Sequence, residues 1–173
     1  LHGITLLIAS SGYQKDVEAQ QIRTLVARGA DALLLIGYQR DQAEYEFLEK
    51  RGVPALVAWA YDAEREQAAI GFDNTEAMKV LTEAVLDRGH TNLAVISAPV
   101  AENDRASGRV AGVLAALAAH DLEIDTVPVV ETPYGFETGA AAFRQLRAER
   151  PDITAVICGN DVLAVGALLA AKE

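Results

Sequence analysis

The stretch Val156-Ile-Cys-Gly-Asn-Asp-Val-Leu-Ala-Val-Gly-Ala-Leu-Leu-Ala170 joins a strand pattern directly to a helix pattern. Its β-branched, apolar start is typical of a buried strand. Asn160 and Asp161 then follow, and their side chains can accept hydrogen bonds from the first free N–H groups of a helix. They would also stand at the carboxyl end of a strand, where open α/β sheets bind ligands. Two roles are therefore open for this pair: a plain helix cap, or a cap that also presents polar groups to a small molecule.

The rest of the chain alternates short apolar runs with longer helical patterns. Most runs are continuous, as expected for parallel strands that are covered on both faces. The predicted strands are residues 4–9, 32–36, 55–58, 69–72, 93–97, 127–130 and 153–158. Arg-Gly pairs at 28–29, 51–52 and 88–89 would each end a helix before a strand, because Gly adopts the left-handed conformation without strain. This pattern predicts an α/β fold with parallel sheets flanked by helices.

A second helix start, Phe72-Asp73-Asn74-Thr75, directly follows the predicted strand 69–72. We place a boundary there and predict two Rossmann-like lobes, residues 1–72 and 73–173. No flexible linker separates them, which favours tight crossings with a ligand cleft between the lobes. The helix that begins at Asp161 has almost no polar face. We expect it to be buried, either by its own lobe or by a second subunit.

Composition narrows the possible partners. The chain has 173 residues, of which 51% are hydrophobic, and a formal net charge of −10. Direct contact with nucleic acid or an anionic membrane is disfavoured, because such contact needs clustered Lys and Arg. No apolar run reaches the ~20 residues of a bilayer helix, and the first residues do not resemble a signal peptide. The single cysteine, Cys158, lies in a strand pattern and is expected to be a buried, inert thiol.

Motifs that would indicate catalysis are missing from the sequence. The three histidines are scattered, with no second ligand at metal spacing, and no serine lies in a GxSxG elbow. Neither a Walker loop nor GxGxxG occurs. We therefore expect no enzymatic activity, no catalytic residue, no metal and no cofactor, and we interpret the chain as a binding protein.

Aromatic side chains, only 6% of the chain, fall beside predicted strand ends. Tyr38 and Trp59 end strands, and Tyr134 lies between a strand and a helix. Flat aromatic faces stack on sugar rings or planar ligands. Packing in the core is the alternative for each one taken alone.

Two arginines, Arg105 and Arg109, open the helix pattern that follows the strand 93–97. They are four residues apart and so share a helix face. A cation is poorly placed at a helix N-terminus, and a local rule broken there often marks function. Guanidinium groups can hold hydroxyls or a carboxylate with two hydrogen bonds. The alternative is a surface salt bridge with Glu102 or Asp104.

Together these segments resemble the effector-binding core of the LacI/GalR family of bacterial transcription repressors. The resemblance covers essentially all 173 residues. It is carried by Ser10-Ser-Gly-Tyr13, Val26-Ala-Arg-Gly-Ala-Asp-Ala-Leu33, Ile70-Gly-Phe-Asp-Asn74, Arg88-Gly-His-Thr-Asn-Leu-Ala-Val-Ile96, the segment 105–112, and Cys158-Gly-Asn-Asp161. The family fold is of the periplasmic-binding-protein type, with two Rossmann-like lobes and a ligand cleft between them.

The resemblance implies a role for each candidate residue. Arg109 and Asn160 match positions that hydrogen-bond the effector, and Asp161 would support them. Tyr134 matches an aromatic residue that stacks on the ligand, and Phe72 matches one at the crossing between lobes. Tyr38 and Trp59 would line the wall of the first lobe. Trp59 replaces a polar residue of sugar-binding relatives, which argues against a simple galactoside. Together with Arg105 and Arg109, it favours a sugar acid. The full expected site is Tyr38, Trp59, Phe72, Asn103, Arg105, Arg109, Tyr134, Asn160 and Asp161.

By the same resemblance, the partner is a small effector: a sugar, a sugar acid or, as a third candidate, a purine. DNA would be bound only through an N-terminal helix-turn-helix that this sequence does not contain. The family's first strand, first helix and last strands are also absent from it, so both lobes are expected to be partial. We expect a cytoplasmic homodimer without membrane contact. The alternative is a periplasmic sugar-binding protein of a transporter, which shares the fold.

Overall fold

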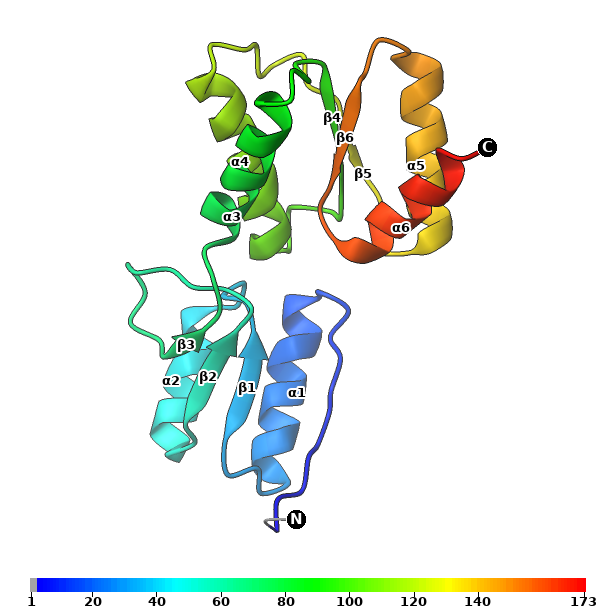
Figure 1. Ribbon diagram of the computed structural model, residues 1–173. Helices are drawn as coiled ribbons and strands as arrows, with labels where there is room; N and C mark the ends of the chain where they lie inside the picture. The colour runs from blue at the N-terminus through cyan, green and yellow to red at the C-terminus, as the bar shows by residue number, and fades with distance from the viewer. Residues whose placement is uncertain (1–2) are drawn as a thin grey trace. The chain divides into compact units, whose positions relative to one another are not determined.

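In the computed structural model, which describes residues 3–173, the chain forms two α/β units. The first ends at Phe72, and the second is Asp73–Glu173. Figure 1 labels the elements of each unit.

The first unit contains two helices and a small parallel sheet. In chain order its elements are α1 (Lys15–Ala27), β1 (Leu33–Ile36), α2 (Gln42–Arg51), β2 (Ala55–Ala58) and β3 (Ala69–Ile70). The strand order is β1-β2-β3, and all pairs are parallel. Residue Leu35 of β1 lies opposite Val57 of β2.

One face of this sheet carries the core of the first unit. Ile22 of α1 and Leu48 of α2 pack together with Leu33 and Leu35 of β1. The alternate residues of the strands point the other way, and Leu34 is 63% exposed there. Within residues 3–72, helices therefore cover this sheet on one face only.

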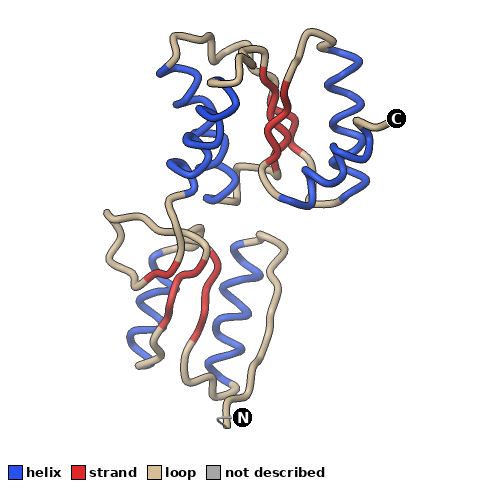
Figure 2. Tube along the Cα trace, in the orientation of Figure 1, coloured by secondary structure: helices blue, strands red, loops and turns tan. Residues whose placement is uncertain are grey.

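In the second unit, helices cover both faces of the sheet. Its elements are α3 (Asn74–Leu86), β4 (Leu93–Ser97), α4 (Asp104–Ala119), β5 (Val129–Glu131), α5 (Phe136–Glu149), β6 (Ala155–Cys158) and α6 (Asp161–Ala170). The strand order is β5-β4-β6, again all parallel. Figures 1 and 2 show this sheet between the α3–α4 pair and the α5–α6 pair.

Alternation along β4 fills both cores of the second unit. Leu93 and Val95 pack with α3 and α4, around Val113. Ala94 and Ile96 point to the opposite face and pack with α5 and α6. All five residues of β4 are buried, as expected for the central strand of a sheet covered on both faces.

Glycine lets the helices of each pair approach closely. A Cβ at Gly112 of α4 would lie 2.2 Å from the carbonyl oxygen of Thr75 on α3. A Cβ at Gly166 of α6 would lie 2.1 Å from the carbonyl oxygen of Phe136 on α5. No larger residue fits at either crossing without moving a helix.

The structure confirms the predicted parallel strands from residue 32 onward, with ends shifted by up to two residues. The three Arg-Gly joints are confirmed as well, because Gly29, Gly52 and Gly89 have φ of 83°, 65° and 86°. The strand predicted at 4–9 is wrong. Those residues are not paired with any strand among residues 3–173, and Ile4 and Ile8 are 86% and 85% exposed. An apolar run becomes a strand only when a neighbouring strand satisfies its backbone groups.

Burial of α6 by its own unit is confirmed for one face, and cover of the other face by a second subunit stays a prediction. Leu163, Gly166 and Ala167 are buried against α5 and the sheet, whereas Leu168 and Leu169 are more than half exposed. Of the helices within residues 3–173, none is long and apolar enough to cross a membrane.

Candidate functional site

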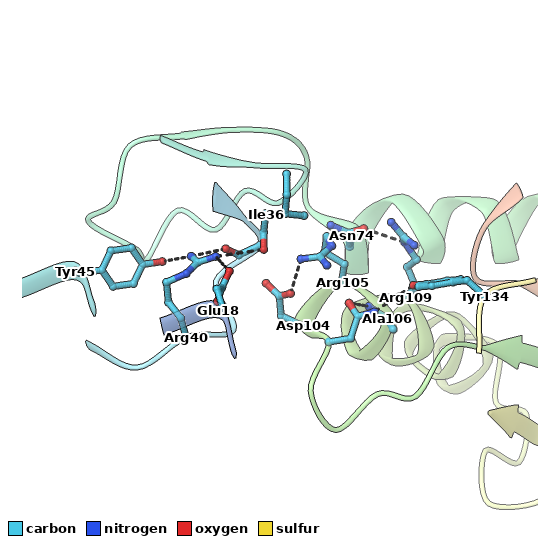
Figure 3. A network of polar contacts seen from close by, with 12 residues as sticks. Glu18, Ile36, Arg40, Tyr45, Asn74, Asp104, Arg105, Ala106, Arg109 and Tyr134 are labelled. Carbon is cyan, nitrogen blue, oxygen red and sulfur yellow. Dashed lines mark hydrogen bonds and ion pairs between the residues drawn. The ribbon is translucent and has the colours of Figure 1, made fainter. Parts of the chain in front are cut away.

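Polar side chains gather where the strands of the second unit end and its helices begin. A parallel sheet brings the carboxyl ends of its strands to one edge, and each strand here leads into a helix. Asn103 precedes α4, Tyr134 precedes α5, and Asn160 precedes α6. Asn74 is the first residue of α3, and Arg109 lies in the second turn of α4. Figure 3 shows Asn74, Arg109 and Tyr134 from this cluster.

Asn103 connects two of these helix starts. Its side-chain oxygen accepts a hydrogen bond from the Ala106 N–H over 3.2 Å, which caps α4. Its Nδ2 donates to the Tyr134 hydroxyl over 3.1 Å. Both side-chain groups of this buried amide are therefore engaged, and the Tyr134 ring is held beside the start of α4.

The two arginines of α4 differ in their surroundings. Arg105 is buried, with 7% exposure, and its Nη1 lies 2.9 Å from the Asp104 carboxylate. The salt-bridge alternative is thus confirmed for Arg105, although the pair is largely buried rather than on the surface. Such a pair fixes the guanidinium in place, because separating it would leave an uncompensated buried charge.

Arg109 instead bonds to neutral oxygens. Its Nε donates to Asn74 Oδ1 over 2.9 Å, and its Nη1 donates to the Gly159 carbonyl over 2.7 Å. One guanidinium therefore joins the first turn of α3, the second turn of α4 and the loop between β6 and α6. Gly159, the residue of that loop to which Arg109 bonds, immediately precedes Asn160.

Asn160 is confirmed as a helix cap. Its side-chain oxygen accepts from the Leu163 N–H over 2.9 Å, with extended backbone angles. Asp161 accepts from the Val162 N–H over 2.9 Å and is exposed. The cap occupies the Asn160 side-chain oxygen, whereas its amide nitrogen has no hydrogen-bond partner within residues 3–173.

Two residues of this edge were not predicted. Asn74, the bonding partner of Arg109, follows the helix cap Asp73, and its place in the segment Phe72-Asp-Asn-Thr was the only signal. Ser97 ends β4 and is fully buried; its hydroxyl has no hydrogen-bond partner among residues 3–173. A serine closing an apolar strand could have drawn attention to the same edge.

In the first unit, Trp59 has an unusual backbone. Its φ is 63°, a left-handed value that costs a residue with a Cβ about 1–2 kcal/mol. The strand pairing holds it there, since its N–H donates to the Ile70 carbonyl over 3.1 Å. The indole is 65% exposed at the end of β2. Strain that presents a large aromatic side chain is a feature of binding sites.

The other first-unit candidates differ in exposure. Tyr38 is buried, and the Arg65 guanidinium lies 5.5 Å from its ring centre. Burial raises the pKa of Tyr38 above its ordinary value. Phe72 is 51% exposed.

Arg40 anchors the loop that carries Tyr38. Its guanidinium donates to the Gly37 carbonyl (2.7 Å), the Tyr45 hydroxyl (2.6 Å) and the Glu18 carboxylate (3.1 Å). These contacts join α1, the end of β1 and α2 (Figure 3). Its side chain is only 2% exposed, so it serves the structure of this unit.

The chemistry of these residues is that of recognition. Amide, guanidinium and phenol groups donate hydrogen bonds to hydroxyl or acidic groups, and aromatic faces pack on rings. Within residues 3–173, no group of three or more His, Cys, Asp or Glu side chains could hold a metal ion.

Comparison with known proteins gives consistent matches. A family described as periplasmic binding proteins and sugar binding domain of LacI family matches residues 1–173. The HTH-type transcriptional regulator GntR of Escherichia coli strain K12 is 30% identical over 169 residues, which are 96% of this chain and 49% of that protein. The chain thus spans about half the length of the curated relatives it matches.

Solved structures agree on the fold. The transcription regulator GntR from Chromobacterium violaceum has a TM-score of 0.89 and 27% identity, covering 97% of this chain and 61% of that one. The Cra transcriptional dual regulator from Pseudomonas putida, in complex with fructose 1-phosphate, has a TM-score of 0.81 and 25% identity, covering 98% and 63%. The predicted fold class, of the periplasmic-binding-protein type, is confirmed.

Proposed function

This chain belongs to the family of periplasmic binding proteins and LacI-type sugar-binding domains, and we propose that it is the effector-binding part of a transcriptional repressor. The effector is a small sugar or sugar acid, with a purine as the third candidate. Binding it changes the affinity for DNA of a helix-turn-helix that lies outside this sequence. The similarity to regulators such as GntR supports this reading.

The observation that carries the proposal is the position of Arg109. Its guanidinium lies at the carboxyl edge of the second sheet, bonded to Asn74 and to the Gly159 carbonyl beside Asn160. This edge is where α/β sheets bind ligands, and it offers hydrogen-bond donors without a catalytic constellation. We propose that Asn103, Arg105, Arg109, Tyr134, Asn160 and Asp161 form the second-unit part of the effector site. Tyr38, Trp59 and Phe72 are the proposed contacts from the first unit.

The mechanism we propose is a population shift. An effector that binds one arrangement of the protein more tightly than another shifts the equilibrium toward it. Effector binding thereby changes the affinity of the protein for operator DNA. By thermodynamic linkage, DNA binding changes the affinity for the effector by the same factor. Arg109 is suited to this role, because its partner Asn74 is the second residue of the second unit.

We further propose that the protein is a cytoplasmic homodimer. The exposed apolar side chains of α6, Val165, Leu168 and Leu169, are candidates for its interface. With a net charge of −10, this part of the protein would leave DNA contact to the separate helix-turn-helix. A dimer would present two such domains to a two-fold symmetric operator.

The test is a titration of the complete protein that carries this chain. Sugars, sugar acids and purines are added while tryptophan fluorescence is followed, with any tryptophan outside this chain replaced so that Trp59, the single tryptophan of this chain, gives the signal. One ligand should give a saturable change, and the same ligand should alter operator binding in a mobility-shift assay. Arg109→Ala should abolish both responses, whereas Arg147→Ala, which removes an exposed arginine from α5, should leave both intact.

A periplasmic sugar-binding protein is the second candidate, because the matching family includes such proteins. It would be a monomer, would carry a signal peptide and would bind sugar without any effect on DNA. An operator response to ligand favours the repressor; tight sugar binding by an exported monomer favours the alternative.

A further inference from the structure

The second unit has a cavity at the edge where the strands of its sheet begin. This edge is opposite to the carboxyl edge, which carries the proposed effector residues. The cavity has a volume of about 170 Å³ and lies where α4 and α5 end and β4 begins. Figure 1 shows these three ends together at one end of this unit. The described residues that line the cavity include none of those proposed for the effector site, so it is a separate candidate site.

Four of the residues that line this cavity are apolar. Leu93 of β4 and Leu117 of α4 are buried, and Leu122 and Val127 of the segment after α4 are partly buried against the same core. A cavity of about 150 Å³ with an apolar lining is large enough to bind benzene. The apolar part of this lining can therefore accept an apolar group about the size of one aromatic ring.

Two charged residues, Glu123 and Arg150, also line the cavity, and they differ in their partners. Arg150 Nη2 lies 2.9 Å from the Asp152 carboxylate, and its Nη1 donates to the Thr126 carbonyl over 3.3 Å. Glu123 is exposed and forms no ion pair within residues 3–173. The other polar residues of the lining carry no charge: Thr91, Asn92 and Thr126. A bound cation would therefore meet a carboxylate without a counter-charge, whereas a bound anion would meet a guanidinium that is already neutralised.

We infer that this cavity is a second small-molecule site, and that it takes a primary amine with an apolar body about the size of one aromatic ring. The body contacts the leucine and valine side chains, and the ammonium group pairs with Glu123. Burial of the body supplies most of the affinity, because an ion pair at an exposed carboxylate changes affinity by no more than about fivefold. For a ligand of this size we expect a dissociation constant of about 0.1–1 mM.

The test uses the complete protein that carries this chain, with leucine and valine methyl groups labelled for NMR. The probe, 2-phenylethylamine, should shift the methyl resonances of Leu122 and Val127 in a saturable manner. The matched alcohol, 2-phenylethanol, keeps the ring without the charge and should bind about twofold to fivefold more weakly. The acid 3-phenylpropionate reverses the charge and should bind more weakly than the alcohol. Methylamine lacks the ring and should cause no shift at about 10 mM.

Two variants test the assignment of the ligand to this cavity. Glu123→Gln removes only the charge and should make the amine and the alcohol bind equally. Thr126→Phe places a ring at the exposed rim of the cavity and should block both ligands. Glu49→Gln is the matched control, because Glu49 is an exposed carboxylate of α2 without an ion pair among residues 3–173. It should leave the preference for the amine unchanged. Circular dichroism shows whether each variant is folded.

Each outcome decides for or against the amine site. A preference for the amine that disappears in Glu123→Gln, with binding lost in folded Thr126→Phe, supports the inference. If none of the three ring-containing probes shifts the Leu122 and Val127 resonances, the cavity does not accept such a ligand and the inference is overturned. Equal binding of amine and alcohol by the wild type, or a preference that persists in Glu123→Gln, overturns it as well. The proposed effector function stands in all of these cases, since different residues form the two sites.

Discussion

Gly112 of α4 lies directly against the backbone of Thr75 on α3, where a Cβ would stand 2.2 Å from the carbonyl oxygen. One turn earlier, Gly108 faces the same threonine, with 3.2 Å from its Cβ position to Thr75 Oγ1. Arg109 lies between these two glycines in the sequence and reaches Asn74, the neighbour of Thr75, over 2.9 Å. The close crossing of the two helices therefore sets the distance at which the proposed effector arginine is held.

Gly112→Ala should destabilise the protein by about 1–3 kcal/mol, because the added methyl overlaps backbone that cannot move alone. Helix propensity by itself predicts the opposite, a gain of about 1 kcal/mol when Ala replaces Gly within a helix. Urea unfolding followed by circular dichroism measures the difference. Effector affinity should fall too, since α3 must shift away from Arg109.

Gly108→Ala is the matched control on the same helix face. Its new methyl would lie 3.2 Å from a threonine hydroxyl, and the nearest backbone atom, Thr75 N, would be 3.6 Å away, so its effect on stability should be small. Equal unfolding free energies for the two variants would contradict the close crossing.

Trp59→Gly should raise stability and impair binding. Glycine adopts φ near 63° without strain, whereas the wild-type residue does not. Trp59→Ala removes the same indole but keeps the strained Cβ, so Trp59→Gly should be more stable than Trp59→Ala by about 1 kcal/mol. Thermal unfolding of the pair measures this difference. If the alanine variant is the more stable one, Trp59 does not have a strained backbone.

Two substitutions of Asn160 should separate its role as the cap of α6 from its proposed role in binding the effector. Asn160→Ala removes the cap of α6 and should cost about 0.5–2 kcal/mol. Asn160→Ser keeps a capping oxygen and should retain most of the stability, yet it lacks the amide N–H groups that a ligand could use. Unfolding free energy and effector affinity are measured on both variants. Full affinity in Asn160→Ser would remove Asn160 from the effector site.

Cys158 should react slowly with iodoacetamide in the native protein. Burial raises the pKa of its thiol to about 11, so little reactive thiolate forms at pH 8. Denatured protein, with an ordinary thiol pKa of about 8.5, should react much faster, on the order of a hundredfold, at that pH. Comparable rates in the two states would show that the thiol is not shielded.

The same thiol gives a pH dependence of stability. Its pKa is higher in the folded than in the unfolded state, so its contribution is fully present below about pH 8.5 and is lost as the pH rises toward 11. The wild type should therefore lose more stability between pH 9 and 11 than Cys158→Ala does. Parallel loss in both proteins would argue against this assignment.

Much of the fold was predictable from local pattern. The central strand β4 was found at its observed ends, 93–97, because a continuous apolar run can only be covered on both faces. The Arg-Gly joints were equally clear, because left-handed backbone favours glycine wherever it occurs. The apolar run 4–9 misled for a physical reason: strand formation depends on a neighbour that a local pattern does not reveal.

The candidate site could be predicted only in part from local sequence pattern. Asn160 could be recognised as a cap, since capping involves residues three apart in the chain. The partner of Arg109 could not, because Asn74 is 35 residues away and reaches it only through the crossing of α3 and α4. Nor could the sequence distinguish Arg105 from Arg109, which share a helix face but not an environment.

By itself, then, the sequence determined the order of strands and helices, the parallel sheets and the end of the second sheet at which polar groups gather. These features follow from hydrophobic period, turn chemistry and caps, all of which act over a few residues. Tertiary structure alone decided the surroundings of Arg109. Arg105 pairs with Asp104, its neighbour in the sequence. Arg109 instead bonds to Asn74 and to the Gly159 carbonyl, which are 35 and 50 residues away and reach it only because the helices and strands pack together.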